Sequence, residues 1–522
     1  MPPRNSTALW SRLCSGILLA ASALLLALHY VHLKADFPHY SPWPDPARVT
    51  DEGWYAGAAI RQILSGQWFL PGDFNPAVAL PVFPALVYAT FRLTGVSVVA
   101  LRALNVSCFG ATLIVLWLLV RRYANPLAAA AAVFLCACCP FYYAYSRLGI
   151  VEPLLALESL LVLLAASYLT LDSSRLRRFL PSAIVGLLLA LMLFTKTTGV
   201  CLYPAVFYLM LSRCGFNLRK FLAPAALAAA VACALGVAYY AAVVRAGLTR
   251  DYYDLFAINH AHIHGRIVPI VLWNVAKKGA LIGPAFYIVA AVSILLAAIF
   301  LRKDPAPLLV TSVLGIAGYG AFITYHGWLM ERYYLVPVPL IAMALVLSLT
   351  RLANSGVLAL RLAASALSAV LLINCIVQIH TLSIWTRTPN YGYAQAADAL
   401  YRVIDRDPSG NRAVISVVSE QLAMFTGERG VFINDVYGTQ PLRLRVLEHK
   451  PGWLIGFDGV SDQAVNALSG LYSRQLVDSE PAFGDDGFHF RMYLYKLSPI
   501  PTQVPAAQDA GSARPPHVSP QP

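Results

Sequence analysis

The stretch Ser97–Arg122, SVVALRALNVSCFGATLIVLWLLVRR, sets the class of the fold. It is long and apolar enough to cross a bilayer as one helix, since a span needs about 20 such residues. Similar runs recur along the 522-residue chain, of which 58% is hydrophobic and only 12% is charged. Soluble domains carry about 25% charged residues. The composition therefore excludes a soluble enzyme, a disordered scaffold and a disulfide-stapled secreted module.

The apolar runs predict a polytopic α-helical membrane protein with about eleven transmembrane helices. They lie near residues 13–33, 97–120, 126–146, 150–171, 180–195, 198–212, 221–244, 280–301, 306–325, 333–350 and 362–382. With a cytoplasmic N-terminus, every loop predicted on the cytoplasmic side is basic, as the positive-inside bias requires. We expect the first run to be a retained anchor, because no clear small-residue cleavage site follows it. The net charge of +13 thus reflects membrane topology, and no nucleic-acid partner is expected.

The segments between the spans predict the domain organisation. Residues 1–385 form a transmembrane module whose first outer loop, residues 34–95, contains two amphipathic stretches. We expect these stretches, Gly53–Leu64 and Pro76–Leu93, to be helices in the membrane interface, because a crossing would reverse the charge pattern. A second outer loop covers about residues 246–279.

Residues 386–498 are predicted to form a small extracytoplasmic α/β domain, because helical and strand patterns alternate there. Helices are expected over 391–404, from 420, over 440–449 and over 462–476, and strands over 413–418, 431–434, 453–457 and 490–496. The Pro-rich residues 499–522 read as a disordered tail. The position of the domain over the outer loops suggests a role in acceptor recognition.

Acidic residues occur at two predicted positions at the membrane surface, where a charged side chain costs free energy. Asp51 and Glu52 open the first interfacial stretch, and Glu152 opens the fourth span at the outer face. Adjacent carboxylates can cap a helix, and the helix dipole favours them there. At an apolar membrane surface, however, a function is the better explanation. Glu152 is better placed to join Asp51 than Glu158, which lies deeper in the same span.

Three cations on the outer side run against the positive-inside bias and call for a reason: Arg147, Lys196 and Arg332. One shared site for a lipid phosphate supplies that reason. The alternative is a set of structural ion pairs, for example Arg332 with Glu331 or Arg147 with Glu152.

Three other motifs are not assigned a catalytic role. The run Cys136, Cys138 and Cys139 lies mid-membrane without neighbouring ligands, so we expect packing residues rather than a metal site. Asp405-Arg406-Asp407 resembles a nucleotide-sugar motif but is expected to be a solvated turn. His260, His262 and His264 leave zinc possible, although no fourth ligand is nearby. We expect no cofactor and no divalent metal.

The order of the motifs resembles the GT-C superfamily of membrane glycosyltransferases. The likeness is to its glycosyltransferase family 39 branch, the protein O-mannosyltransferases and the lipid A aminoarabinose transferase. It covers about residues 10–380 and rests on the following motifs, in chain order: Asp51-Glu52 with Tyr55, Asn75-Pro76, Leu101-Arg102, Arg147-x-Gly149-x-x-Glu152-Pro153, Thr195-Lys196-x-x-Gly199 and Glu331-Arg332-Tyr333-Tyr334-Leu335-x-Pro337-x-Pro339.

The resemblance implies a GT-C-type transmembrane module in a bacterial plasma or inner membrane. It implies transfer of a hexosyl or pentosyl group from a polyprenyl-phosphate donor to a glycan, lipid or protein on the extracytoplasmic face. Asp51 corresponds to the catalytic carboxylate and Glu152 to a second acid. The chain has Asn75 and Trp54 where the family often has a basic residue, so the donor sugar stays open.

The residues support this chemistry independently. A positioned carboxylate can take the proton of an acceptor hydroxyl, and fixed cations can meet the charge of the departing phosphate. We therefore predict catalytic roles for Asp51, Glu52 and Glu152, phosphate binding by Lys196, Arg332 and Arg147, and a substrate pocket with Tyr55, Asn75 and Tyr333. Direct displacement would invert the anomeric centre. A transporter or lipid-linked sugar flippase is the alternative, but no internal repeat favours it.

Overall fold

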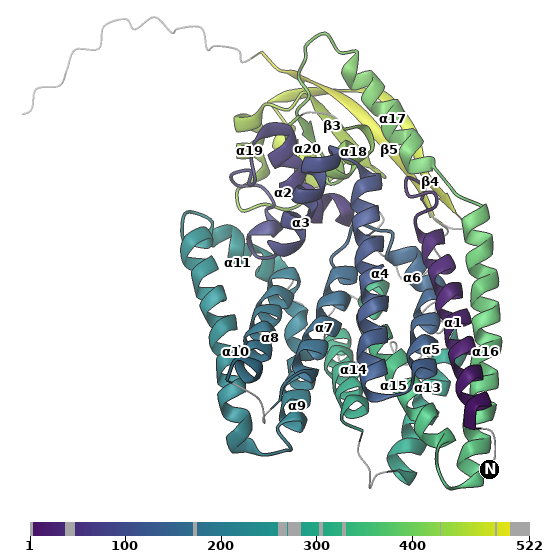
Figure 1. The fold of residues 1–522 in the computed structure, drawn as a ribbon. Helices are drawn as coiled ribbons and strands as arrows, with labels where there is room; N and C mark the ends of the chain where they lie inside the picture. Colours follow the sequence, from purple (N-terminus) through teal and green to yellow (C-terminus); the bar gives the residue numbers. More distant parts are fainter. Residues whose placement is uncertain are drawn as a thin grey trace, which may run out of the picture.

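Figure 1 shows a bundle of long helices that run side by side, with a sheet domain at one end. The computed structural model describes residues 4–36, 47, 49–170, 175–258, 269, 283–301, 306–325, 330–427, 430–485 and 488–501. The end of the bundle that carries the sheet domain is called the domain end below. The predicted histidines at 260, 262 and 264, and nearly all of the predicted tail, lie outside the described residues.

Each of the eleven predicted spans corresponds to a helix, or to a pair of helices, in the described part of the chain. The helices are α1 (Arg4–His29), α4 (Val98–Tyr123), α5 (Pro126–Ala137), α6 (Pro140–Tyr145), α7 (Glu152–Ser167), α8 (Arg175–Thr195), α9 (Tyr203–Arg213), α10 (Leu218–Tyr239), α13 (Pro284–Phe300), α14 (Pro307–Tyr325), α15 (Pro337–Ala353) and α16 (Leu358–Arg387). Among the described helical segments, five are long and apolar enough to cross a membrane: Leu9–His29, Val98–Tyr123, Leu218–Val244, Glu331–Ala353 and Leu358–Arg387.

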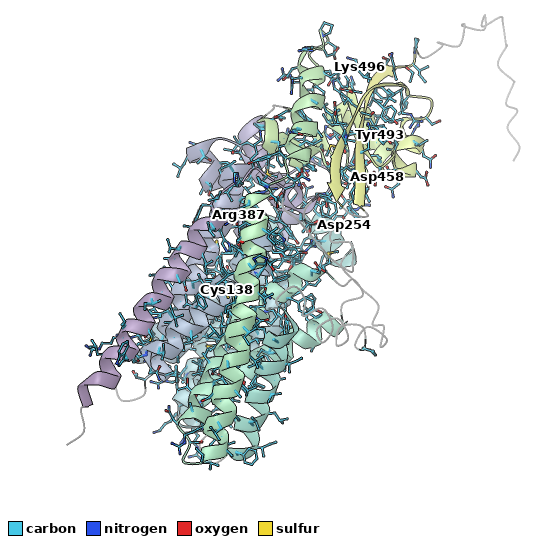
Figure 2. All side chains as sticks on the ribbon, turned by 90° about the vertical axis from the view of Figure 1, so that its right-hand side faces the viewer. Cys138, Asp254, Arg387, Asp458, Tyr493 and Lys496 are labelled. Atoms are coloured by element: carbon cyan, nitrogen blue, oxygen red, sulfur yellow. The ribbon has the colours of Figure 1, made fainter. Side chains whose placement is uncertain are left out.

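The third predicted span is two helices rather than one. It breaks after α5 because Pro140 has no backbone N–H and cannot continue the α5 hydrogen-bond ladder. Cys138 lies at this break, in the helix bundle and away from the sheet domain (Figure 2). All nine cysteines are free thiols.

The first outer loop lies between the bundle and the sheet domain (Figure 1). It contains α2 (Asp51–Ser65), the short helix η2 (Pro76–Val78) and α3 (Val82–Thr94), in the two stretches predicted to be helical. Gly66 ends α2 with a φ of +76°, a left-handed conformation that glycine adopts without strain. The helix α11 (Thr249–Ile258) belongs to the second outer loop, and Figure 2 shows its Asp254 near the junction of bundle and domain.

The C-terminal domain is a small α/β domain, as predicted. Its five-stranded sheet has the order β2-β1-β3-β5-β4, with β1 parallel to β2 and β3, and β5 antiparallel to β3 and β4. Its elements are α17 (Gly392–Asp405), β1 (Val414–Ile415), α18 (Ser419–Thr426), β2 (Phe432–Ile433), α19 (Leu442–His449), β3 (Trp453–Phe457), α20 (Asp462–Leu468), β4 (Tyr472–Asp485) and β5 (Phe488–Pro499).

One prediction in this domain is wrong. The helix expected over 462–476 ends at Leu468, and the long strand β4 begins at Tyr472. The reason is a type II turn: Ser469, with a φ of −56° and a ψ of 128°, leaves the helix, Gly470 follows with a φ of +71°, and Leu471 N donates to the carbonyl of Leu468 at 3.0 Å. The apolar residues Leu476 and Val477 therefore belong to an edge strand.

Candidate active site

Four charged side chains meet at the domain end of the bundle, and they are called the site cluster below. Asp51 is the first residue of α2, and Glu152 is the first residue of α7. Lys196 follows the last residue of α8, and Arg332 lies in the short helix η6 (Glu331–Leu335). All four are buried. Segments that are up to 281 residues apart in the sequence (332 − 51) thus converge on one point.

In the site cluster, one cation bridges the two carboxylates and the second cation pairs with one of them. Arg332 Nη1 lies 2.7 Å from Asp51 Oδ2, and Arg332 Nε lies 3.4 Å from Glu152 Oε1. Lys196 Nζ pairs with the same oxygen of Glu152. Thr50 Oγ1 donates to Asp51 Oδ1 at 3.0 Å. Arg332 therefore links the two acids, and the formal charges of the four side chains balance.

Both acids occupy helix starts, where the unpaired backbone N–H groups of the first turn favour negative charge. Pro153 follows Glu152 at the first turn of α7 and costs no hydrogen bond there. This explains how an acid is tolerated in so apolar a chain.

Tyrosine rings line the site cluster. Lys196 Nζ lies 4.3 Å from the centre of the Tyr333 ring, and the Arg332 guanidinium carbon lies 5.6 Å from it, so both cations face the same π surface. Tyr55, one turn after Asp51 on α2, interacts electrostatically with Glu152, Arg332 and Asp51. Burial raises the pKa of Tyr55 well above its ordinary value, so the hydroxyl stays protonated and able to donate. The predicted pocket residues Tyr55 and Tyr333 are therefore at the site.

Glu52, for which a catalytic role is predicted, pairs with Arg102 rather than with a cation of the site cluster. Neighbouring residues on a helix point about 100° apart, so Asp51 and Glu52 face different partners. Glu52 accepts from Arg102 Nε at 2.9 Å and Nη2 at 2.7 Å, and from Gly149 N at 2.8 Å. Arg102 also donates to two backbone carbonyls that follow α1. Glu52 therefore ties α2 to α1, α4 and the turn before α7.

Arg147 and Asn75 also have positions other than those predicted. Arg147 donates to the carbonyl of His32 and lies over the Tyr143 ring, which fixes the end of α1 rather than a phosphate. Asn75 Oδ1 accepts from Arg61 at 3.0 Å, and its Nδ2 donates to Asp251 at 2.8 Å, so its amide holds the loop instead of lining a pocket. The alternative pair of Arg147 with Glu152 does not form in the described contacts, and Arg332 pairs with Asp51.

A second buried charge cluster, which is not among the predicted site residues, lies between the first outer loop and the C-terminal domain and consists of Arg61, Asp73, Glu420 and Arg445. Arg61 belongs to the predicted interfacial helix, and a buried cation in such a helix needs an acidic partner. No sequence pattern indicates that this partner is Glu420, which lies 359 residues further along the chain.

Within the described ranges, no three His, Cys, Asp or Glu side chains are grouped so that they could hold a metal ion. The site cluster itself contributes two carboxylates, and both are engaged by cations.

Comparisons with known proteins agree with this architecture. Residues 76–240 match the model of the dolichyl-phosphate-mannose-protein mannosyltransferase family. The apo crystal structure of ArnT from Cupriavidus metallidurans superimposes with a TM-score of 0.59 at 14% identity, and the match covers 92% of this chain and 97% of that one. The structure of ArnT bound to undecaprenyl phosphate gives a TM-score of 0.59 at 13% identity, with coverage of 91% and 97%.

The archaeal oligosaccharyltransferase AglB from Archaeoglobus fulgidus, in complex with an inhibitory peptide and a dolichol-phosphate, is also similar. Its TM-score is 0.53 at 13% identity, and the match covers 94% of this chain and 75% of that one. Among curated protein sequences, none matches the chain significantly. Identities this low establish the fold alone. The chain has the GT-C fold, which confirms the fold class predicted from its sequence.

Proposed function

We propose that this protein transfers a sugar from a polyprenyl-phosphate donor to an acceptor at the domain end of the bundle. The observation that carries the proposal is the site cluster in a GT-C fold, in which Arg332 bridges Asp51 and Glu152 and Lys196 pairs with Glu152. A carboxylate beside two fixed cations at a membrane surface suits a reaction whose leaving group is a lipid phosphate.

The donor phosphate is expected to bind Lys196 and Arg332. Both cations are buried and close to the Tyr333 ring, and a guanidinium can hold two phosphate oxygens at once. The similar protein ArnT has been crystallised with undecaprenyl phosphate, and AglB with a dolichol-phosphate, which supports a lipid-phosphate ligand here. The matched family model concerns dolichyl-phosphate-mannose donors. A sugar of either hexose or pentose type fits these observations.

Asp51 acts as the general base in this proposal. The acceptor hydroxyl attacks the anomeric carbon, the bond from that carbon to the phosphate oxygen breaks, and Asp51 takes the hydroxyl proton. The polyprenyl phosphate leaves as an anion, so no acid is needed to protonate it. A phosphate between Lys196 and Arg332 competes with the carboxylates for these cations, which leaves Asp51 more basic when the donor is bound. One direct displacement inverts the anomeric centre.

Glu152 orients the cations. Its Oε1 contacts both Lys196 and Arg332, so it fixes the spacing of the phosphate-binding groups and offsets their charge before the donor arrives. The proposal needs no divalent metal, since the two cations supply the electrostatic stabilisation that a metal would give. Release of lipid phosphate is therefore expected to be insensitive to EDTA.

The charge pattern of the loops supports a multi-pass location in a bacterial plasma membrane with a cytoplasmic N-terminus. The site cluster and the C-terminal domain then face the extracytoplasmic side, where the acceptor is a glycan, a lipid or a protein.

The experiment measures free polyprenyl phosphate released from a panel of polyprenyl-phosphate sugars by the purified protein in liposomes, with an envelope extract as acceptor. Release by the wild type but not by Asp51→Asn supports the transferase and names the donor sugar. Movement of labelled lipid between leaflets without any release would contradict the proposal and favour a flippase.

A further inference from the structure

The helix that carries Asp51 packs directly on the C-terminal domain. Gly53 and Gly57 of α2 face α18: a Cβ at Gly53 would lie 2.5 Å from the backbone N of Gln421, and one at Gly57 would lie 2.9 Å from Glu420 Oε1. At Gly53 only glycine allows this approach, because the near atom is backbone; at Gly57 a Cβ would displace the Glu420 carboxylate, which is paired with Arg61. In addition, Trp54 Nε1 donates to the carbonyl of Val417 at 3.2 Å.

A buried charge cluster holds the other end of α2. We call Arg61, Asp73, Glu420 and Arg445 the domain clamp. Arg61, near the C-terminal end of α2, pairs with Glu420 of α18 and lies 3.7 Å from Asp73 Oδ2. Arg445 of α19 pairs with Asp73 Oδ1 at 2.6 Å. Asp73, in the first outer loop, therefore lies between a guanidinium of α2 and a guanidinium of the C-terminal domain.

Both carboxylate oxygens of Asp73, at the centre of the domain clamp, have partners, whereas Arg61 Nε and Arg445 Nε have none among the described residues. Asp73 also accepts from the backbone N–H of Phe74 at 2.7 Å and of Asn434 at 3.1 Å, and Arg445 donates to the carbonyl of Asn434 at 2.7 Å. Gln440 N donates to the carbonyl of Gly72 at 3.0 Å, which adds a main-chain link between loop and domain. Buried charges with partners of this quality fix a unique geometry, because any displacement leaves a charge uncompensated.

These contacts reach the site cluster through a single rigid element. Asp51 and Arg61 lie on one helix, about 15 Å apart at a rise of about 1.5 Å per residue. A displacement of α2 on the domain therefore also displaces the Asp51 carboxylate. A shift of about 1 Å in a reacting group can cost about 100-fold in rate.

We propose that the C-terminal domain is a positioning element of the active site: α18 and the domain clamp seat α2 so that Asp51 faces Arg332. This inference rests on the proposed function, since it assigns the domain a role in placing the base of that reaction. Arg61, Asp73, Glu420 and Arg445 are positioning residues, because none of them has a described contact with the site cluster.

The test compares Asp73→Asn with the wild type in liposomes. The substitution removes the charge between the two guanidinium groups but keeps the shape of the side chain. We expect kcat to fall 10- to 100-fold and the KM for the lipid donor to change less than about threefold, because Lys196 and Arg332 are untouched. Amide hydrogen exchange of α2 should become faster, while that of α4 should not.

The matched control is Asp405→Asn. Asp405 lies in the same domain and pairs with Arg412, but the pair is more than a third exposed on both sides. A surface pair of this kind contributes little, so kcat and hydrogen exchange should stay at wild-type values.

Two further variants test whether the contacts between α2 and the domain set the rate. The double variant Asp73→Asn/Arg445→Gln should be no slower than the slower single variant, since both substitutions break one interaction. If Asp73→Asn does not fold, Gly57→Ala tests the seat of α2 without removing a charge, and Gly236→Ala, a helical glycine with open space around it, is its control. Gly57→Ala should lower kcat at least fivefold without changing the donor KM.

The outcomes separate this proposal from the proposed function. No transfer by the wild type with any donor would overturn the proposed function. Transfer by the wild type with an unchanged kcat in folded Asp73→Asn, or in Gly57→Ala, would overturn the positioning role alone. Equal losses in kcat and donor affinity would also contradict it, because they would indicate general disruption.

Discussion

The two buried charge clusters at opposite ends of α2 differ in how the oxygens of their carboxylates Asp73 and Glu152 are paired. In the domain clamp, Asp73 faces two guanidinium groups and accepts from two backbone amides. In the site cluster, Glu152 Oε2 has no hydrogen-bond partner among the described residues, and both cations lie against an aromatic ring. Each cluster also has a guanidinium Nε without a hydrogen-bond partner in the described part of the chain, so the difference lies in the carboxylates. The comparison teaches that a carboxylate paired at both oxygens holds the fold, whereas a cluster with an unpaired carboxylate oxygen can rearrange around a substrate.

The largest effect is expected when the general base of the site cluster is removed. Asp51→Asn should lower kcat by about 100- to 10,000-fold, the usual contribution of a general base. The melting temperature should stay close to that of the wild type, because Arg332 keeps Glu152 as a charge partner. Donor binding, measured with a fluorescent polyprenyl phosphate, should survive. Normal turnover by this variant would move the base to another residue.

The neighbouring acid should behave in the opposite way. Glu52→Gln leaves the buried guanidinium of Arg102 without its charge partner, which costs about 3–5 kcal/mol when a buried ion pair is broken. We expect a clear fall in melting temperature, while the folded fraction keeps a donor KM close to the wild-type value. Glu448→Gln, at an exposed position of α19, is the control. An unchanged melting temperature would show that the Glu52–Arg102 pair does not hold the fold.

Much of the fold follows from local patterns that the sequence displays directly. The apolar runs predict the helices of the bundle, and alternation predicts most elements of the C-terminal domain. The error at residues 469–476 arose because Leu471, Leu476 and Val477 continue an apolar pattern past Gly470, and periodicity alone does not detect such a break. The break of the third span at Pro140 could have been predicted from the proline itself.

The site was predictable only in part, because contacts between distant segments leave no local signal. Asp51, Glu152, Lys196 and Arg332 were singled out as charges that are costly at the outer membrane boundary. The same criterion also selected Glu52 and Arg147, because the free-energy cost of a buried charge does not indicate which residue compensates it. Arg102 neutralises Glu52, and the His32 carbonyl accepts from Arg147. The domain clamp depends on pairs more than 350 residues apart.

A smaller effect should follow from removing one cation of the site cluster. Lys196→Ala removes a charge that the proposal assigns to the donor phosphate, and it leaves Glu152 paired with Arg332. We expect the KM for the lipid donor to rise about 10- to 100-fold, the range of a lost charge-assisted hydrogen bond. The control is Lys34→Gln, because Lys34 forms a half-exposed pair with Asp398. An unchanged affinity for polyprenyl phosphate would remove Lys196 from the phosphate site.

The smallest effect concerns Asp435, a buried acid of the C-terminal domain that interacts electrostatically with Arg445 of the domain clamp. Asp435 follows β2; its Oδ2 accepts from Ser461 at 3.1 Å, and its Oδ1 has no hydrogen-bond partner within the described ranges. Burial raises the pKa of Asp435 from the ordinary 3.8 to about 6, against the attraction of Arg445. Because the folded state holds the proton more tightly, this residue contributes stability below about pH 4, and the contribution is lost as the pH rises through about 6.

Asp435→Asn should remove this dependence. The melting temperature of the variant, relative to the wild type, should rise by a few degrees between pH 4.5 and 6.5 and then level off, since a change of about 1 kcal/mol shifts the melting temperature of a large domain by about 2–4 °C. Ser473→Ala, at an exposed position of β4, should show no such trend. If the difference in melting temperature between Asp435→Asn and the wild type does not change with pH, Asp435 is ionised over the whole pH range measured. The attraction of Arg445 for the Asp435 carboxylate would then outweigh the cost of burying its charge.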